Sequence, residues 1–185
     1  MNIAICGNSI AAHSKQHTTD DDNIEWMTVA GSRLISHQRH KRIENQIYKT
    51  RAQGIVLVEP ASIEILDFTK TKNGRKSFEE LKQEMIEEMG KISKTAVKHR
   101  KIIVIIRCEL KDGIRGEMNA KLNDFYDKLK SEGFDNIHVD PNILSRQYVY
   151  DDIHLNKIGE QMLMVKIQEY VDNFRKADKK TRYMQ

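Results

Sequence analysis

The sequence has few cysteines and prolines, and it has no long apolar run. It has 2 cysteines and 2 prolines in 185 residues, and neither a Gly- or Pro-rich linker nor an internal repeat divides it. Its apolar opening run is too short for a secretory signal, and no stretch is long and apolar enough to span a membrane. Cys6 and Cys108 lie in apolar, strand-like runs, which favours buried free thiols in a reducing compartment. We therefore expect an intracellular protein that does not contact membranes.

The sequence also lacks the motifs of common cofactor sites. The first apolar run is not followed by Gly-x-Gly-x-x-Gly, which argues against a dinucleotide site. His13, His17, His37 and His40 have no Cys or carboxylate partners at the intervals typical of metal ligands. We therefore predict neither a cofactor nor a metal.

The charge is nearly balanced overall but uneven along the chain. Lys and Arg number 31 against 27 Asp and Glu, for a formal net charge of +4. Basic runs are usually solvated faces, so we expect any nucleic-acid binding to be weak, non-specific and strongly dependent on salt. The basic residues lie in two regions: Arg33, Arg39, Lys41, Arg42, Lys49 and Arg51, and then Arg175, Lys176, Lys179, Lys180 and Arg182.

Short β-branched runs alternate with longer segments of helical spacing. The runs are continuously apolar, which indicates strands buried on both faces, as in a parallel sheet. We expect five strands, at residues 2–6, 24–29, 54–59, 101–107 and 134–140. Helical spacing is found at residues 34–51, 78–96, 118–129 and 158–170, and residues 67–76 form a polar loop.

This alternation predicts a three-layer α/β/α sandwich on a five-stranded parallel sheet, which is a flavodoxin-like α/β fold. The length of 185 residues suits one domain. We assign that domain to residues 1–175 and expect residues 176–185 to form a basic, flexible tail.

Polar residues follow the first predicted strand at once. Gly7-Asn8-Ser9-Ile10 comes directly after the apolar run that ends at Cys6. In a parallel sheet this order places the Ser9 hydroxyl at the carboxyl edge, where ligands bind. Gly7 leaves room for a tight turn, and backbone N–H groups at the next helix start could bind an oxyanion. An ordinary turn with a helix N-cap is the alternative interpretation.

A second polar segment, Asp151-Asp152-Ile153-His154, follows the fifth predicted strand and precedes the last helix, which Asn156 could cap. The Asp151 carboxylate, three residues before His154 in a non-helical segment, can turn back to the imidazole and fix its tautomer. A surface turn is the alternative. We predict that Ser9 is a nucleophile, His154 its base and Asp151 the orienting acid, the minimum set for acyl transfer by a serine.

Taken in order, these segments resemble the sequence blocks of the SGNH (GDSL-like) hydrolase superfamily. Gly7-Asn8-Ser9-Ile10 resembles the first block, with Asn in place of Asp, and Asp151 to His154 matches the fifth. The segment from Val29 to Leu34 resembles the second block, and the resemblance implies that Gly31 donates a backbone N–H to the oxyanion. It implies a serine esterase in a compact form similar to domains of retroelement and viral polyproteins.

The third block departs from the family pattern. The family has Gly-x-Asn-Asp there, whereas this chain reads Glu59-Pro60-Ala61-Ser62. Ser62 falls near the position of the missing Asn, so the resemblance makes its hydroxyl the candidate second donor. Loss of one oxyanion donor typically costs ~10²–10³ in rate, which predicts low activity.

Two functions and one unrelated fold remain open at this point. The first is an esterase for small ester or acetylated substrates, and the short inter-strand loops predict an open cleft for them. The second is a non-catalytic SGNH-like binding or assembly module, which the missing Asn and the basic regions would suit. The third is a flavodoxin-like binding domain without relation to this superfamily.

Overall fold

Five parallel strands form one sheet in the order β2-β1-β3-β4-β5. The computed structural model describes residues 2–17, 24–71, 76–111 and 117–183. The five-stranded parallel sheet predicted from the sequence is confirmed. Its strands are β1 (Ile3–Gly7), β2 (Ile24–Trp26), β3 (Gly54–Val58), β4 (Ile102–Cys108) and β5 (Ile137–Leu144).

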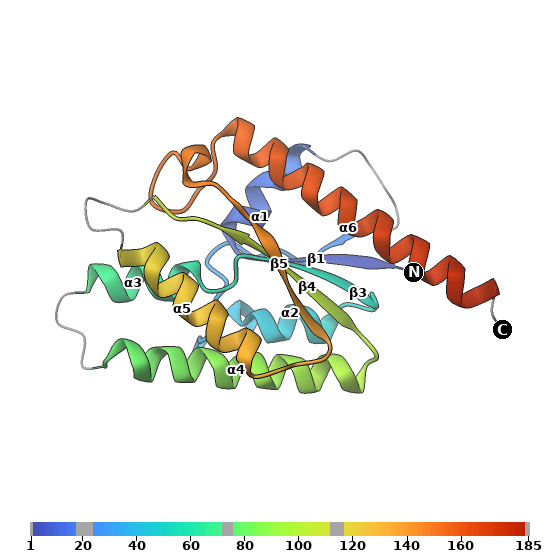
Figure 1. Cartoon of the computed structure of the whole chain (residues 1–185), viewed down its shortest axis with the longest axis horizontal. Coiled ribbons are helices and arrows are strands. Elements are labelled where there is room, and N and C mark those ends of the chain that lie inside the picture. Colours follow the sequence, from blue (N-terminus) through green and yellow to red (C-terminus); the bar gives the residue numbers. More distant parts are fainter. Residues whose placement is uncertain (1, 18–23, 72–75, 112–116, 184–185) are drawn as a thin grey trace.

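Helices cover both faces of the sheet, which confirms the three-layer α/β/α arrangement (Figure 1). On one face lie α1 (Ser9–Ser14) and α6 (Lys157–Tyr183). On the other lie α2 (Ile43–Lys49), α3 (Ser62–Lys70), α4 (Phe78–Lys98) and α5 (Glu117–Ser131). None of the described helices combines the length and the apolar character needed to cross a membrane. Single 3₁₀ turns occur at η1 (Lys15–His17), η2 (Arg39–Lys41) and η3 (Arg146–Tyr148).

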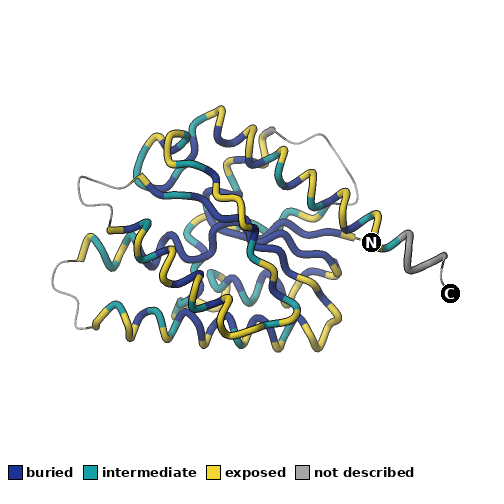
Figure 2. The backbone as a smooth tube through the Cα atoms, in the orientation of Figure 1, coloured by how far each residue is buried: buried dark blue, intermediate teal, exposed yellow. Residues whose placement is uncertain are grey.

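The strands divide their side chains between two apolar cores. In β1, Ile3 and Ile5 pack on the α1/α6 side, whereas Ala4 and Cys6 pack on the opposite side. Every residue of β1 and β3 is buried, and these inner strands are dark blue in Figure 2. Burial on both faces explains why these strands are continuously apolar instead of alternating.

The helix expected over residues 34–51 is largely wrong. Residues 31–38 are not helical, and α2 begins only at Ile43. The reason is a backbone pairing that helical spacing does not reveal. The Arg33 N–H donates to the Lys41 carbonyl at 2.9 Å, and the Ile43 N–H donates to the Arg33 carbonyl at 3.0 Å. These bonds fold the segment back on itself and use the groups that a helix would need.

The polar loop expected at residues 67–76 begins later than predicted. Helix α3 continues through Lys70, with Ile63 and Ile65 buried in the core, and residues 72–75 lie outside the described residues. Strand β2 is also shorter than expected and ends at Trp26. Helix α6 runs to Tyr183, so it includes residues 176–183 of the expected tail.

The two cysteines are free, buried thiols. Burial raises the pKa of Cys6 to about 12, and burial likewise raises the pKa of Cys108 well above its ordinary value. Both thiols therefore stay protonated at neutral pH and pack as small apolar groups.

A buried carboxyl group joins the ends of two strands to a helix. Glu59, which follows β3 with a positive φ of 32°, is fully buried. Its Oε1 accepts a hydrogen bond from the Tyr126 hydroxyl at 2.8 Å, and its Oε2 accepts from the Cys108 N–H at 2.9 Å. Burial raises the pKa of Glu59 to about 7, although these hydrogen bonds oppose the rise.

The raised pKa predicts how stability depends on pH. In the unfolded chain the Glu59 carboxyl ionises near 4.5, whereas in the folded protein it stays protonated up to about 7. The folded state therefore loses stability as pH rises through that interval. Between about pH 5 and pH 8, we expect the free energy of unfolding in urea to fall by roughly 2–3 kcal/mol more for the wild type than for Glu59→Gln.

The exposed carboxylate of Glu87 on α4 provides the matched control, because Glu87→Gln removes the same charge from the surface. Glu64, whose pKa burial also raises to about 7, contributes in the same direction and is unchanged in both variants. Equal pH slopes for the wild type, Glu59→Gln and Glu87→Gln would contradict this account.

Candidate active site

The turn that leads from β1 to Ser9 requires glycine at position 7. Ser9 is the first residue of α1, and only Asn8 separates it from β1, whose last residue, Gly7, has φ 151°. A Cβ at position 7 would lie 3.0 Å from the Val58 carbonyl oxygen and 3.1 Å from Ala11 Cβ. The backbone of β1 therefore passes close to β3 and α1 at the point where the chain turns toward Ser9.

The side chain of Asn8 ties this turn to the next strand. Asn8 is fully buried, and its Oδ1 caps α1 by accepting from the Ile10 N–H at 2.9 Å. Its Nδ2 donates to the Glu59 carbonyl at 3.1 Å and to Ser62 Oγ at 3.0 Å. One amide thus satisfies a helix start and joins the ends of β1 and β3.

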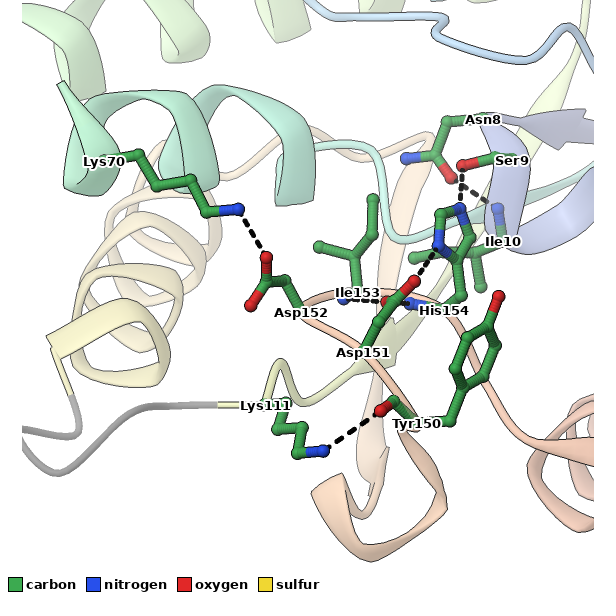
Figure 3. Close-up of polar contacts among 10 residues, drawn as sticks. All are labelled: Asn8, Ser9, Ile10, Lys70, Lys111, Tyr150, Asp151, Asp152, Ile153 and His154. Carbon is green, nitrogen blue, oxygen red and sulfur yellow. Dashed lines mark hydrogen bonds and ion pairs between the residues drawn. The ribbon is translucent and has the colours of Figure 1, made fainter.

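Ser9, His154 and Asp151 form a continuous chain of hydrogen bonds (Figure 3). Ser9 Oγ lies 2.8 Å from His154 Nε2, and His154 Nδ1 lies 2.7 Å from Asp151 Oδ2. The structure therefore brings together three residues that the sequence places at opposite ends of the chain. An ionised carboxylate can only accept, so the neutral imidazole carries its hydrogen on Nδ1 and offers Nε2 to the serine.

Asp151 is held ionised by the segment around it. Its Oδ1 accepts from the N–H groups of Ile153 at 2.9 Å and His154 at 2.7 Å. Burial would raise the pKa of Asp151, but hydrogen bonds from the His154 backbone and ring and from Ile153 outweigh burial and lower it. Asp152 turns away from the imidazole and pairs with Lys70 of α3 (Figure 3).

Backbone contacts hold the His154 segment in place. The Tyr150 N–H donates to the His154 carbonyl at 2.9 Å, and the Asn156 N–H donates to the Tyr148 carbonyl at 2.6 Å. Asn156 Oδ1 accepts from the Gly159 N–H at 2.9 Å, which caps the start of α6. A Cβ at Gly159 would lie 2.7 Å from Tyr148 Cβ, so glycine allows α6 to begin against this loop.

Gly31 lies in a turn that Gln46 fastens to the end of β1. Gln46 Oε1 accepts from the Gly7 N–H at 2.9 Å, and its Nε2 donates to Ser32 Oγ at 2.7 Å and to the Gly7 carbonyl at 3.2 Å. Gly31 has φ 72°. Among the residues that the structure describes, the N–H groups of Ser9 and Gly31 have no hydrogen-bond acceptor.

The structure does not present Ser62 to the site as a donor. Its side chain is fully buried, and its hydroxyl accepts from Asn8 and donates to the Glu59 carbonyl at 3.3 Å. The expected oxyanion role would require this hydroxyl to leave both partners. Ser62 instead supports Asn8, an arrangement that local sequence does not reveal because the two residues meet across two strands.

Two rings beside His154 were not singled out for this site from the sequence. The His13 ring stacks at 4.9 Å from the imidazole, and the Tyr150 ring stacks at 6.1 Å. Tyr150 is 55% exposed. His13 lies four residues after Ser9 in α1, so helical spacing alone could have placed both on one face.

The hydrogen-bonded chain of Ser9, His154 and Asp151 is suited to proton transfer. In the described part of the chain, no group of three or more His, Cys, Asp or Glu side chains could hold a metal ion. The hydrogen-bonded chain can take a proton from the Ser9 hydroxyl onto His154 while Asp151 stabilises the imidazolium.

Solved structures share this fold at low sequence identity. A GDSL-like lipase from Bacteroides thetaiotaomicron is 10% identical, with a TM-score of 0.64 over 93% of this chain and 88% of that one. An acetyl xylan esterase is 13% identical, with a TM-score of 0.61 over 92% of this chain and 100% of that one. No protein-family model and no curated protein matches the sequence.

A carbohydrate esterase whose active site displays divergent catalytic and non-catalytic binding functions is also similar. It is 14% identical, with a TM-score of 0.57 over 92% of this chain and 68% of that one. The chain therefore has the α/β sandwich fold of SGNH and GDSL-like esterases and acylhydrolases.

The contacts of Asn8 predict a graded loss of stability. Asn8→Ser keeps an N-cap acceptor for Ile10 but lacks the amide that reaches β3, so we expect it to lower the free energy of unfolding by about 1–2 kcal/mol. Asn8→Ala loses the cap as well, and we expect a further loss of ~1 kcal/mol. Urea unfolding followed by circular dichroism measures both, with Asn45→Ser on α2 as control. An Asn8→Ser variant as stable as the wild type would show that the amide contacts contribute nothing.

Proposed function

We propose that this protein is a serine esterase that cleaves small esters or acetyl groups through an acyl-enzyme at Ser9. One observation carries the proposal. Ser9 Oγ, the His154 ring and the Asp151 carboxylate are joined by hydrogen bonds of 2.8 and 2.7 Å at the carboxyl edge of the sheet. The same fold occurs in solved esterases and lipases, which supports this reaction class.

Acylation uses the three residues in order. Ser9 Oγ attacks the substrate carbonyl carbon and forms a C–O bond, while His154 Nε2 takes the hydroxyl proton. Asp151 stabilises the resulting imidazolium through Nδ1. The imidazolium then gives its proton to the leaving alkoxide oxygen as the original ester bond breaks, which leaves the acyl group on Ser9.

Deacylation repeats these steps with water. His154 accepts a proton from water as the water oxygen attacks the acyl carbon, and it returns that proton to Ser9 Oγ when the acyl–serine bond breaks. The carboxylic acid product leaves, and the enzyme regains its starting protonation state. No cofactor is required for these steps.

The oxyanion is stabilised by backbone groups. We assign this role to the N–H groups of Ser9 and Gly31, which have no other acceptor among the described residues. Ser62 is engaged by Asn8 and Glu59, so a third donor is lacking and the rate should be low. Loss of one such donor costs ~10²–10³ in rate in other hydrolases.

A hydrolysis assay on p-nitrophenyl acetate tests this function. We expect slow but measurable release of p-nitrophenol that falls roughly 10³-fold or more in Ser9→Ala and in His154→Ala, because either change removes the nucleophile or its base. Ser14→Ala, a change to the buried serine at the other end of α1, is the matched control and should retain the rate. Equal rates in the wild type and Ser9→Ala would contradict the proposal.

Substitutions of the two neighbouring aspartates should lower kcat to very different extents. Asp151→Asn removes the carboxylate that holds the His154 tautomer, so kcat should fall about 10³–10⁴-fold. Asp152→Asn only removes an exposed ion pair with Lys70, so we expect kcat within about twofold of the wild type. Steady-state kinetics on the same ester compare the variants, and similar losses in both would refute the role of Asp151.

A binding module without catalysis is the second candidate, and the engaged Ser62 hydroxyl is the observation that favours it. A solved carbohydrate esterase of this fold combines catalytic and non-catalytic binding functions at its active site. Such a module would bind an acetylated ligand without hydrolysing it. Product formation under saturating ligand distinguishes the two candidates directly.

A further inference from the structure

A hollow lies around Tyr48, on the side of the sheet opposite α1. Two adjoining cavities, with volumes of about 540 and 410 Å³, share Arg39, Asn45 and Tyr48 in their linings. Both are formed by η2 and α2, and Thr95 of α4 borders the larger one. We call the combined cavities the Tyr48 groove.

Cations dominate this groove. Arg42 lines the larger cavity and Lys49 the smaller one, while Arg39 lines both. Within the described residues, none of these three side chains forms an ion pair with a carboxylate. The Arg42 Nε donates to the Ser36 carbonyl at 2.6 Å, which orients the guanidinium without neutralising it. Glu44 is the one carboxylate among the described residues that line the two cavities. A concave surface with three cations and one carboxylate has a positive potential, which attracts a polyanion.

An exposed aromatic ring lies among these cations. Tyr48 is 57% exposed, although it lines both cavities, and His99 meets its ring edge-on at 5.9 Å. Because Tyr48 remains 57% exposed beside His99, much of its ring surface is accessible to a ligand. An unpaired nucleotide base can stack on a flat aromatic ring while the phosphates of the same strand pair with the neighbouring cations.

The combination favours a single-stranded nucleic acid over other polyanions. A membrane surface would favour apolar side chains projecting outward, whereas this ring lies in a hollow with polar walls. A duplex presents stacked bases that a tyrosine ring cannot reach, whereas a single strand presents each base face.

We propose that the Tyr48 groove binds single-stranded nucleic acid, with phosphates at Arg39, Arg42 and Lys49 and a base stacked on Tyr48. This site is separate from Ser9 and does not depend on the esterase activity. The second basic region lies on α6, across the sheet, and the side chains of Lys179, Lys180 and Arg182 are outside the described residues.

Fluorescence anisotropy with a labelled oligo(dT) tests the groove on the full chain. At about 50 mM salt we expect saturable binding that weakens steeply toward about 200 mM, because phosphate contacts release counterions. Tyr48→Ala should weaken binding about tenfold through lost stacking, whereas Tyr48→Phe keeps the ring and should bind like the wild type. Arg39→Ala and Lys49→Ala should each lower the salt slope by about one.

The controls separate the groove from net charge and from catalysis. Lys130→Ala removes the same charge from the exposed surface of α5 and should leave affinity within twofold. Ser9→Ala should bind like the wild type, so failure of the esterase proposal would not affect this result. The thermal unfolding midpoint of each variant checks that it is folded.

Three results would overturn the proposal. The first is the absence of binding at low salt. The second is equal affinity of Tyr48→Ala and the wild type, which would reduce the groove to scattered phosphate contacts. The third is displacement of the oligonucleotide by phosphatidylserine vesicles with tighter binding to the vesicles, which would identify a membrane surface.

Discussion

The position of Ser9 depends on the buried amide of Asn8. This side chain caps α1 and also donates to Glu59 and Ser62 at the end of β3. The turn after β1 is thereby fastened to the neighbouring strand, and Ser9 is held 2.8 Å from His154. An amide suits this position because it accepts on one side and donates on the other, whereas an ionised carboxylate could only accept.

The same edge of the sheet contains a buried carboxyl group, that of Glu59. Glu59 is fully buried, and it orders the ends of β3 and β4 because its two oxygens accept from Tyr126 and Cys108. Burial raises its pKa to about 7, so the folded protein holds a carboxyl that would ionise in water. Ser62, one turn further on, serves Asn8 instead of an oxyanion. The proposed esterase therefore lacks, at Ser62, a donor that would speed ester hydrolysis.

Much of the fold, and the proximity of the three candidate site residues, could be predicted from the sequence. The strands were predictable because β-branched runs such as Ile102–Cys108 are buried on both faces, and Asp151 with His154 lies where a loop follows the last strand. The features that could not be predicted depend on contacts that local sequence patterns do not reveal. The Arg33 pairing with Lys41 and Ile43 replaces a predicted helix, and the Ser62 hydroxyl is taken by Asn8 from another strand. The rings of His13 and Tyr150 meet His154 only in the folded chain.

The proposed reaction requires Ser9 to be an activated nucleophile. Incubation with a fluorophosphonate probe, followed by proteolysis and mass spectrometry of the labelled peptide, examines that oxygen directly and does not depend on the natural substrate. The account predicts a single phosphonylated residue, Ser9, with labelling that is lost in Ser9→Ala and strongly slowed in His154→Ala. An unlabelled wild-type protein, or a label on another residue at the same rate in both variants, would contradict it.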